Sequence, residues 1–404
     1  MIDQEVIPSH NPEEDYSIGN QQENQRTDFL EISVIAEIIQ LIEQIDNKCQ
    51  GQIGEDIVNE RIKQVSYSKI LCNVYGKDVT YLIKAYAQLG IAYLDITYYE
   101  QAQEHLLKAF KLNENLSDES NLNMKEYQIK ILVNLSKCYL ENDKENAALQ
   151  ICERSLKMNQ TLFGEDHISN ADIYYVLAKI NTKMKNYETA IENLRKMYNI
   201  FEKIYGLESE KIAKLCMEIG QVYDMWNLEN DSVEYYRKSY EIWEKIINDD
   251  NYEVLFQIAM KLSDLLTKLQ KDEEAYHILC ETDEKYGEKT TIQPRDRFKY
   301  QQTRIQKCKS KNDLNLVLDE YLRLEKFLDE QMENQKTLAK TCVSIGYIYL
   351  ELGEKQKCLD YLSKAEHIFK VNGDKKYEDD IQQRKIDIQK QPEQSQHDES
   401  EFAD

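Results

Sequence analysis

Residues that break helices are scarce in this sequence. Only 4 of its 404 residues are proline and 12 are glycine. Inside a helix, glycine costs about 1 kcal/mol and proline about 3 kcal/mol relative to alanine. Their scarcity argues against a loop-rich chain and predicts a nearly all-helical protein with few interruptions.

Patterns typical of metal, nucleotide or catalytic sites are also missing. The cysteines number nine, none forms a C-x-x-C pair, and the histidines are isolated from one another. Neither G-x-G-x-x-G nor G-x-x-x-x-G-K-[ST] occurs. We therefore expect no catalytic, metal-binding or cofactor-binding residues, and no enzyme activity. The cysteines are predicted to be small buried thiols in a reducing compartment.

Long apolar runs are absent as well. The longest apolar stretch, residues 29–45, is interrupted by Glu31, Glu37, Gln40 and Glu43. A membrane-spanning helix needs about 20 consecutive apolar residues, and a signal peptide needs an apolar segment after a basic start. We therefore expect neither, and predict a cytoplasmic protein without membrane insertion.

Basic residues are outnumbered by acidic ones. The chain has 74 acidic and 51 basic residues, which gives a net charge of −23. Binding to nucleic acid or to anionic membranes depends on cations that neutralise phosphates, so neither class of partner is expected. A basic or mixed-charge protein partner fits better, although an acidic surplus also serves solubility alone.

One pattern recurs six times in the remaining sequence. An apolar residue is followed by a small one on a first predicted helix, and another small residue lies twelve positions later on a second. The apolar and small pairs are Leu89-Gly90, Leu135-Ser136, Leu177-Ala178, Ile219-Gly220, Leu262-Ser263 and Ile345-Gly346. The later small residues are Ala102, Ala148, Ala190, Ser232, Ala275 and Cys358.

This pattern predicts a stack of helix pairs. The small residues let two helix backbones approach, while apolar and aromatic neighbours fill the spaces between them. The apolar residues are separated by 46, 42, 42, 43 and then 83 residues. The last interval has room for one more unit near residues 303–324, which lacks the small residues, so we expect a more loosely packed helix pair there.

The pattern resembles the tetratricopeptide repeat (TPR) family over residues 78–369, with 28–75 as a divergent opening pair. The period exceeds the 34 residues usual in that family, and Tyr-Gly or Phe-Gly turns separate the units at Gly76, Gly164, Gly206 and Gly287. Both features are similar to the kinesin-light-chain type. The run at residues 72–94 also resembles ciliary TPR proteins. The resemblance implies an all-α, right-handed superhelical solenoid of about seven to eight helix pairs.

We predict the following organisation. The N-terminal and C-terminal acidic tails, residues 1–27 and 389–404, are expected to be disordered because they are polar and charged. Between them lie a divergent capping pair at 28–77, regular units at 78–287, a degenerate pair at 288–332, and a last unit with a terminal helix at 333–388. We expect these parts to form one elongated domain.

The resemblance implies that the first helix of each unit lines a groove. The residues expected on this face include six lysines and three aspartates among twenty-four positions, a balance of +3 in a chain of −23. The candidate groove residues are Lys84, Ile91, Lys130, Val133, Lys137, Lys179, Lys214 and Gln221. They would suit an extended acidic or mixed-charge segment of a partner; the alternative is a chance distribution of nine charges.

Two tryptophans lie in the fourth unit. Trp243 follows Tyr236 and Tyr240 at helical spacing, which predicts a place in the core. Trp226 lies near a turn, where it is either a packing residue or a surface anchor for a partner.

These features predict a non-catalytic scaffold or adaptor that binds other proteins, in a ciliary, axonemal or other cytoskeletal assembly, including a microtubule-associated or dynein-associated complex. The ciliary part rests on the resemblance of residues 72–94. Two alternatives stay open. One is a peptide-sensing regulatory subunit of an enzyme, and the other is a kinesin-light-chain-like cargo adaptor.

Overall fold

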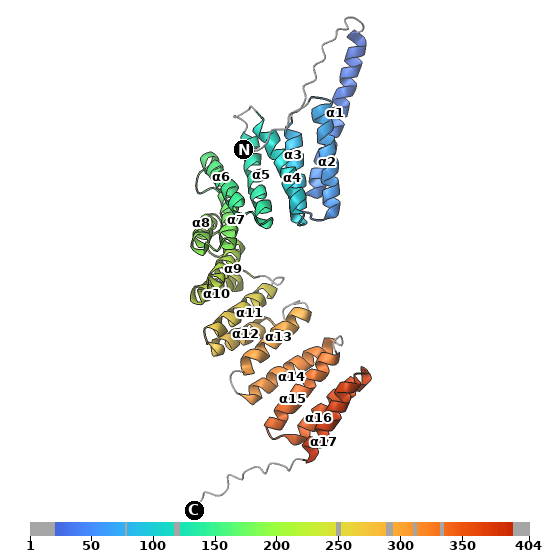
Figure 1. Cartoon of the computed structure of the whole chain (residues 1–404), viewed down its shortest axis with the longest axis vertical. Helices are drawn as coiled ribbons and strands as arrows, with labels where there is room; N and C mark the ends of the chain where they lie inside the picture. The colour runs from blue at the N-terminus through green and yellow to red at the C-terminus, as the bar shows by residue number, and fades with distance from the viewer. Residues whose placement is uncertain are drawn as a thin grey trace, which may run out of the picture. The chain divides into compact units, whose positions relative to one another are not determined.

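The computed structural model describes residues 21–76, 79–116, 122–247, 252–287, 294–309, 313–331 and 335–390. Within these ranges the regular secondary structure consists of 17 α-helices (Figure 1). The all-α prediction is therefore confirmed. The chain divides into two compact units, residues 1–180 and 181–404, where the sequence had suggested one elongated domain. The predicted C-terminal tail and residues 1–20 of the predicted N-terminal tail lie outside the described residues, apart from Gln389 and Lys390.

Unit 1 is built from consecutive antiparallel helices. They are α1 (Gln21–Cys49), α2 (Glu55–Asn73), α3 (Thr80–Asp95), α4 (Tyr99–Glu114), α5 (Leu122–Glu141), α6 (Glu145–Phe163) and most of α7 (Ser169–Lys183). Neighbours in sequence pack together from α1 to α6, and α3 also contacts α5 directly. Helix α1 begins within the predicted tail, at Gln21 rather than near residue 28, because the run of glutamines and Glu23 has good helix propensity.

Unit 2 continues the same arrangement. It contains α8 (Tyr187–Tyr205), α9 (Glu210–Met225), α10 (Glu229–Ile246), α11 (Tyr252–Lys268), α12 (Asp272–Tyr286), α13 (Pro294–Lys309), α14 (Leu314–Gln331), α15 (Gln335–Glu351), α16 (Lys355–Val371) and α17 (Lys375–Lys390). Consecutive helices again pack against each other from α8 to α17. The first helices of successive pairs begin at residues 80, 122, 169, 210, 252, 294 and 335. The spacing of 41 to 47 residues therefore includes a pair, α13 and α14, that lacks the small residues.

Small residues lie where paired helices come closest. A Cβ atom added to Gly90 on α3 would be 2.6 Å from Cγ of Leu106 on α4. One added to Gly220 would be 2.8 Å from the ring of Tyr236, and the Ser232 hydroxyl donates to the Gly220 carbonyl at 2.8 Å. These contacts confirm the packing role predicted for the small residues.

Six of the described turns inside the pairs share one backbone conformation. Each places a residue in the left-handed region directly after the first helix; these residues are Thr97, Asp143, Lys185, Asn227, Gln270 and Gly353. The next backbone N–H then donates to the carbonyl five residues earlier, for example from Tyr98 to Tyr93 at 2.9 Å. This is the Schellman arrangement that satisfies the last carbonyl groups of a helix.

Glycines lie at the predicted turns after α2, α6, α8 and α12, and three of the four have a left-handed backbone. Gly76, Gly164 and Gly206 have φ values of 59°, 89° and 79°. Gly287 is different, since its φ of −58° is helical and its N–H donates to the Asp283 carbonyl. There the glycine is required by crowding, because a Cβ atom would lie 2.4 Å from that carbonyl oxygen.

The pair α13 and α14 has a polar interior in place of the small residues. Arg304 occupies the position held by Leu262 and Ile345 in the neighbouring pairs, and its side chain is 1% exposed. Its guanidinium group pairs with Glu320 of α14 at 2.6 Å and with Asp283 of α12. Tyr276 donates to Glu320 at 2.8 Å. A charged cluster therefore joins three successive helices, α12, α13 and α14, where the regular pattern fails.

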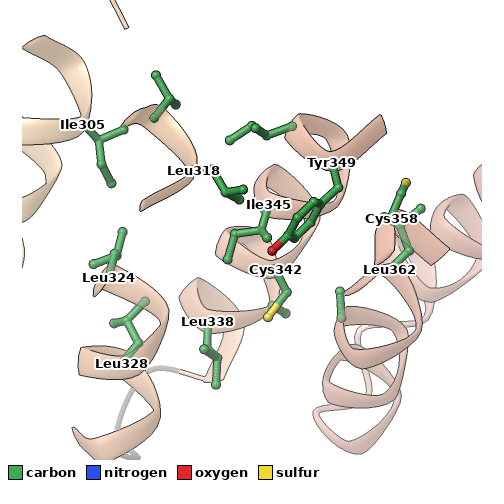
Figure 2. Packing of buried hydrophobic residues seen from close by; sticks show 14 of the residues in the cluster. Ile305, Leu318, Leu324, Leu328, Leu338, Cys342, Ile345, Tyr349, Cys358 and Leu362 are labelled. Carbon is green, nitrogen blue, oxygen red and sulfur yellow. The ribbon is translucent and has the colours of Figure 1, made fainter. Parts of the chain in front are cut away.

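Apolar packing resumes beside this cluster. Figure 2 shows Ile305 of α13 and Leu324 and Leu328 of α14 near one edge of the buried core, with Leu338, Cys342, Ile345 and Tyr349 along α15. Leu318 of α14 and Cys358 and Leu362 of α16 are also labelled in this core. The unit thus combines a polar segment at α13 with an apolar stack that extends to α17.

The cysteines are packing residues. All nine are free thiols, and seven of them are buried. Burial raises the pKa of Cys138 and Cys152 to about 12, so neither is a reactive thiolate near neutral pH. In the described ranges, no helix is both long and apolar enough to cross a membrane.

Candidate binding surfaces

The candidate lysines on α3 and α5 lie together in unit 1. The Nζ atoms of Lys84 and Lys130 are 5.2 and 5.5 Å from the ring centroid of Tyr127, which lies one turn before Lys130 on α5. A cation within about 6 Å of an aromatic ring is attracted by its electron-rich face. Because α3 and α5 contact each other directly, two successive first helices present these ammonium groups on one surface.

A hydrogen-bonded network adjoins this pair of lysines. Arg61 of α2 pairs with Asp46 of α1, donates to Gln64 at 2.8 Å, and donates to Gln88 of α3 at 3.1 Å. Gln64 in turn donates to Asp46 at 2.8 Å. We call Asp46, Arg61, Gln64, Lys84, Gln88, Tyr127 and Lys130 the Tyr127 cluster. Its Arg61 and Gln64 were not predicted, although both are buried polar residues beside Val58 and Val65 on α2.

The charges of the Tyr127 cluster are only partly balanced. Arg61 forms an ion pair with Asp46, and Lys130 forms one with Glu126, one turn earlier on α5, at 2.6 Å. Lys84 has no ion pair with a carboxylate among the described residues. Burial raises the pKa of Tyr127, with a further contribution from Asp46, so the phenol stays neutral at physiological pH. The described surface therefore has one cation without a carboxylate partner, Lys84, beside the exposed and weak ion pair of Lys130 with Glu126.

The other candidates of unit 1 lie along the same first helices. Lys137 is two turns after Lys130 on α5 and donates to Asn134 at 3.3 Å. Ile91 is partly exposed on α3, whereas Val133 is 7% exposed and therefore not open to a partner, contrary to its predicted place on the groove. Lys179 is exposed on α7, with its Nζ 4.6 Å from the ring of Tyr175.

The remaining candidates belong to unit 2. Lys214 is exposed on α9 and pairs with Glu210 one turn earlier, and Gln221 is exposed two turns later. Such exposed pairs on one helix contribute about 0.3–0.5 kcal/mol, so they open readily for another partner. The structure brings Lys84 and Lys130 together directly, while Lys214 and Gln221 form part of a different unit.

Trp226 is part of an aromatic group at a turn of unit 2. It is 37% exposed and stacks on Tyr223 and Tyr187, with ring centroids 6.4 and 6.2 Å apart. Tyr223 stacks on Tyr235 and accepts a hydrogen bond from Arg195 at 3.1 Å. Trp226 is therefore both packed and accessible. Trp243 is 4% exposed, which confirms its predicted place in the core.

Known sequence families match several of the helix pairs. The tetratricopeptide repeat family matches residues 127–203 and 169–245 with one model, and 83–116 and 339–367 with another. These ranges contain five of the six copies of the apolar and small pattern in whole or in part. The matched repeats are units of protein interaction, and no catalytic family is indicated.

Two curated proteins share part of the sequence. The Clustered mitochondria protein homolog of Candida albicans is 29% identical over 135 residues, which are 32% of this chain and 10% of that protein. Tetratricopeptide repeat protein 23-like of Mus musculus is 26% identical over 207 residues, which are 50% of this chain and 45% of that protein. The chain thus matches less than half the length of either relative.

One solved structure matches part of the chain. It contains the nearly identical TPR-like repeats of a putative kinesin light chain from Podosopora anserina. The sequences are 15% identical, the similarity covers 52% of this chain and 97% of that one, and the TM-score is 0.45.

Proposed function

Because the chain is a tetratricopeptide-repeat protein, we propose that it is a non-catalytic scaffold whose Tyr127 cluster binds an acidic or mixed-charge segment of a partner protein. The observation that carries this proposal is that the ammonium groups of Lys84 and Lys130 both lie near the Tyr127 ring, 5.2 and 5.5 Å from its centroid. A partner carboxylate placed between them would meet one cation without a carboxylate and one whose pair with Glu126 is exposed.

The mixed charge of the Tyr127 cluster sets the chemistry of the segment. Its cations are Arg61, Lys84 and Lys130, and Asp46 with the adjoining Glu126 supplies two carboxylates. Lys137 extends the basic side along α5, and partly exposed Ile91 supplies apolar surface. An extended segment with acidic side chains, and with one basic or apolar residue among them, would be complementary to this surface.

The cellular setting is the second part of the proposal. We place the scaffold in a ciliary or microtubule-associated assembly, on the resemblance of residues 72–94 to ciliary TPR proteins. These residues supply Lys84 and Gln88 of the Tyr127 cluster. Proximity labelling in the native cell tests the setting: axonemal, microtubule or dynein-associated neighbours would support it. An enzyme as the dominant neighbour would favour a regulatory subunit, and a microtubule motor with its cargo would favour a cargo adaptor.

Charge reversal tests the binding surface. The triple variant Lys84→Glu, Lys130→Glu and Lys137→Glu should reduce recovery of the main labelled partner at least about tenfold, since each reversal replaces an attraction by a repulsion. Circular dichroism would verify that the variant keeps its helices.

A matched control is available on the second helices of unit 1. Lys108, Lys111 and Lys157 are exposed on α4 and α6, and reversing all three changes the net charge by the same amount. This control should keep its partner. Equal loss in the two triple variants would show that only net charge matters, and full retention in the first would refute the role of the Tyr127 cluster.

A further inference from the structure

A hollow lies between α13, α14 and α15 of unit 2. Its volume is about 520 Å³, and a second hollow of about 320 Å³ adjoins it beyond Tyr321. The larger one is lined by residues of all three helices, including Phe298 of α13 and Tyr321 of α14. Volumes of 300–1,000 Å³ are usual for sites that bind small molecules.

The hollow coincides with the pair that has lost its small residues. Ile305 of α13 stands where Ser263 and Gly346 lie in the neighbouring pairs, and Leu324 of α14 stands where Thr282 and Ala365 lie. Both large side chains line the hollow. Larger residues at these positions keep α13 and α14 from approaching as closely as other pairs, which explains why the space opens here.

The lining is basic. Lys299 and Lys309 of α13 and Lys340 of α15 line the hollow, and among the described residues no acidic side chain does so. None of the three lysines forms an ion pair with a carboxylate in the described part of the chain. Lys309 and Lys340 instead lie 5.2 and 5.8 Å from the rings of Tyr321 and Tyr377. In a chain with a net charge of −23, three such cations in one hollow call for an anionic ligand.

The lining offers hydrogen-bond donors more than acceptors. Gln302 and Gln306 lie between Lys299 and Lys309 on the same side of α13, and their carboxamides can donate. The hydroxyls of Thr303, Thr341 and Ser344 already donate to carbonyls of their own helices at 3.0–3.2 Å, so the lysines and glutamines supply the donors for a ligand. The described lining of the larger hollow has no carboxylate, whereas Asp313 and Glu351 line the smaller one. The hollow therefore suits a ligand whose polar atoms are mainly acceptors.

The lysines are spread along the hollow, which suits a ligand with more than one anionic group. Lys299 and Lys309 are ten residues apart on α13, about 15 Å along the helix axis. Phosphate groups several ångströms apart on one molecule could each meet a different lysine. Lysine binds phosphate as a point charge, and the lining contains no arginine fork of the kind that favours a planar carboxylate.

We propose that this hollow binds a small molecule bearing two or more phosphate groups, with Lys299, Lys309 and Lys340 as its cationic contacts. Phe298 and Tyr321 would lie against the non-phosphate part. The site is separate from the Tyr127 cluster and does not depend on the proposed scaffold function. Two kinds of ligand carry phosphate groups in this way: a compact ring with several phosphates and a linear polyphosphate.

Calorimetric titration of the full chain tests the proposal with three probes. Inositol hexakisphosphate represents the compact ligand, inorganic tripolyphosphate the linear one, and pentaglutamate an acidic peptide of comparable charge. One phosphorylated probe should bind once per chain and at least about tenfold more tightly than pentaglutamate. The phosphorylated probe that binds more tightly shows whether the ligand is a compact ring or a linear chain.

Two double variants separate the hollow from general charge effects. Lys299→Met with Lys340→Met should weaken that probe about tenfold or more, because each charge-assisted contact contributes about 1.5 kcal/mol or more. Lys211→Met with Lys376→Met removes two exposed lysines elsewhere in unit 2 and should bind as the native chain does.

Hydrogen exchange gives a readout that needs no variant. Binding should slow exchange in peptides covering residues 299–309 and 335–344 of the native chain. Absence of saturable binding up to about 1 mM, equal affinity for pentaglutamate, undiminished binding by the Lys299 and Lys340 variant, or unchanged exchange at these helices would each overturn the proposal.

Discussion

The replacement Arg304→Met should loosen α13 and α14 far more than the loss of one side chain on the surface. The side chains of Arg304 and Glu320 are 1% and 4% exposed and lie 2.6 Å apart. Methionine has a similar length but no charge, so Glu320 would be left in the interior with only the hydroxyl of Tyr276 as partner. Asp283 would keep its contact with Arg297 at 2.7 Å.

The expected magnitude follows from the burial of this pair. Removing one partner of a buried ion pair costs about 3–5 kcal/mol, because the remaining charge is uncompensated. Replacing both partners by apolar residues is often neutral or stabilising. The double variant Arg304→Met with Glu320→Met should therefore recover most of the stability that either single variant loses.

Hydrogen exchange by mass spectrometry measures this effect locally. A single melting temperature would combine two units, whereas exchange of peptides from residues 294–331 reports the opening of α13 and α14 themselves. A loss of 3–5 kcal/mol would speed their exchange by roughly two to four powers of ten.

An exposed pair provides the control. Arg237→Met removes the surface contact with Glu274 at 2.8 Å, and exchange in its helix α10 should change less than about fivefold. The reasoning would be refuted if Arg304→Met had an equally small effect. It would also be refuted if the double variant lost as much stability as the two single variants together.

Three other substitutions test the helix packing. Gly90→Ala should destabilise unit 1 by about 1–2 kcal/mol, because the added methyl group meets Leu106, whereas Gly346→Ala in unit 2 should be nearly neutral with its nearest contact at 3.3 Å; hydrogen exchange in α3 and α15 measures each effect locally. Burial lowers the pKa of His105, so the unfolded chain binds the proton more readily than the native one. Stability should therefore fall as pH drops from about 7 through 6.5 and below, and His105→Phe should weaken this dependence in urea titrations at pH 5 and 7.5.

The regular helix pairs were predictable because their pattern is a direct consequence of helix contact. Gly90 and Gly220 had to be small where paired helices meet, and a recurring small residue at a fixed distance from an apolar one reveals that geometry. The pair α13 and α14 was predictable as an interval of the right length. Its interior was not, since Arg304 is a strongly polar residue in a sequence position that apolar residues fill elsewhere.

The candidate surface was predictable only as a set of positions. Helical spacing placed Lys84 and Lys130 on first helices, but their meeting at Tyr127 depends on the direct contact of α3 with α5. Val133 is buried, although the spacing alone had put it on that surface. Gly287 shows a similar limit, because its sequence resembles the other turns while its backbone is helical.

The left-handed turns inside the helix pairs also bear on how the chain folds. Each turn is closed by hydrogen bonds between residues only a few positions apart, as from Lys144 to Tyr139 at 2.9 Å. The contacts that define a pair are therefore local in sequence, and a low contact order favours fast folding. A helix pair can therefore fold before the next pair has been synthesised. During synthesis on the ribosome the pairs would fold in order, and each folded pair would present a surface on which the next one packs.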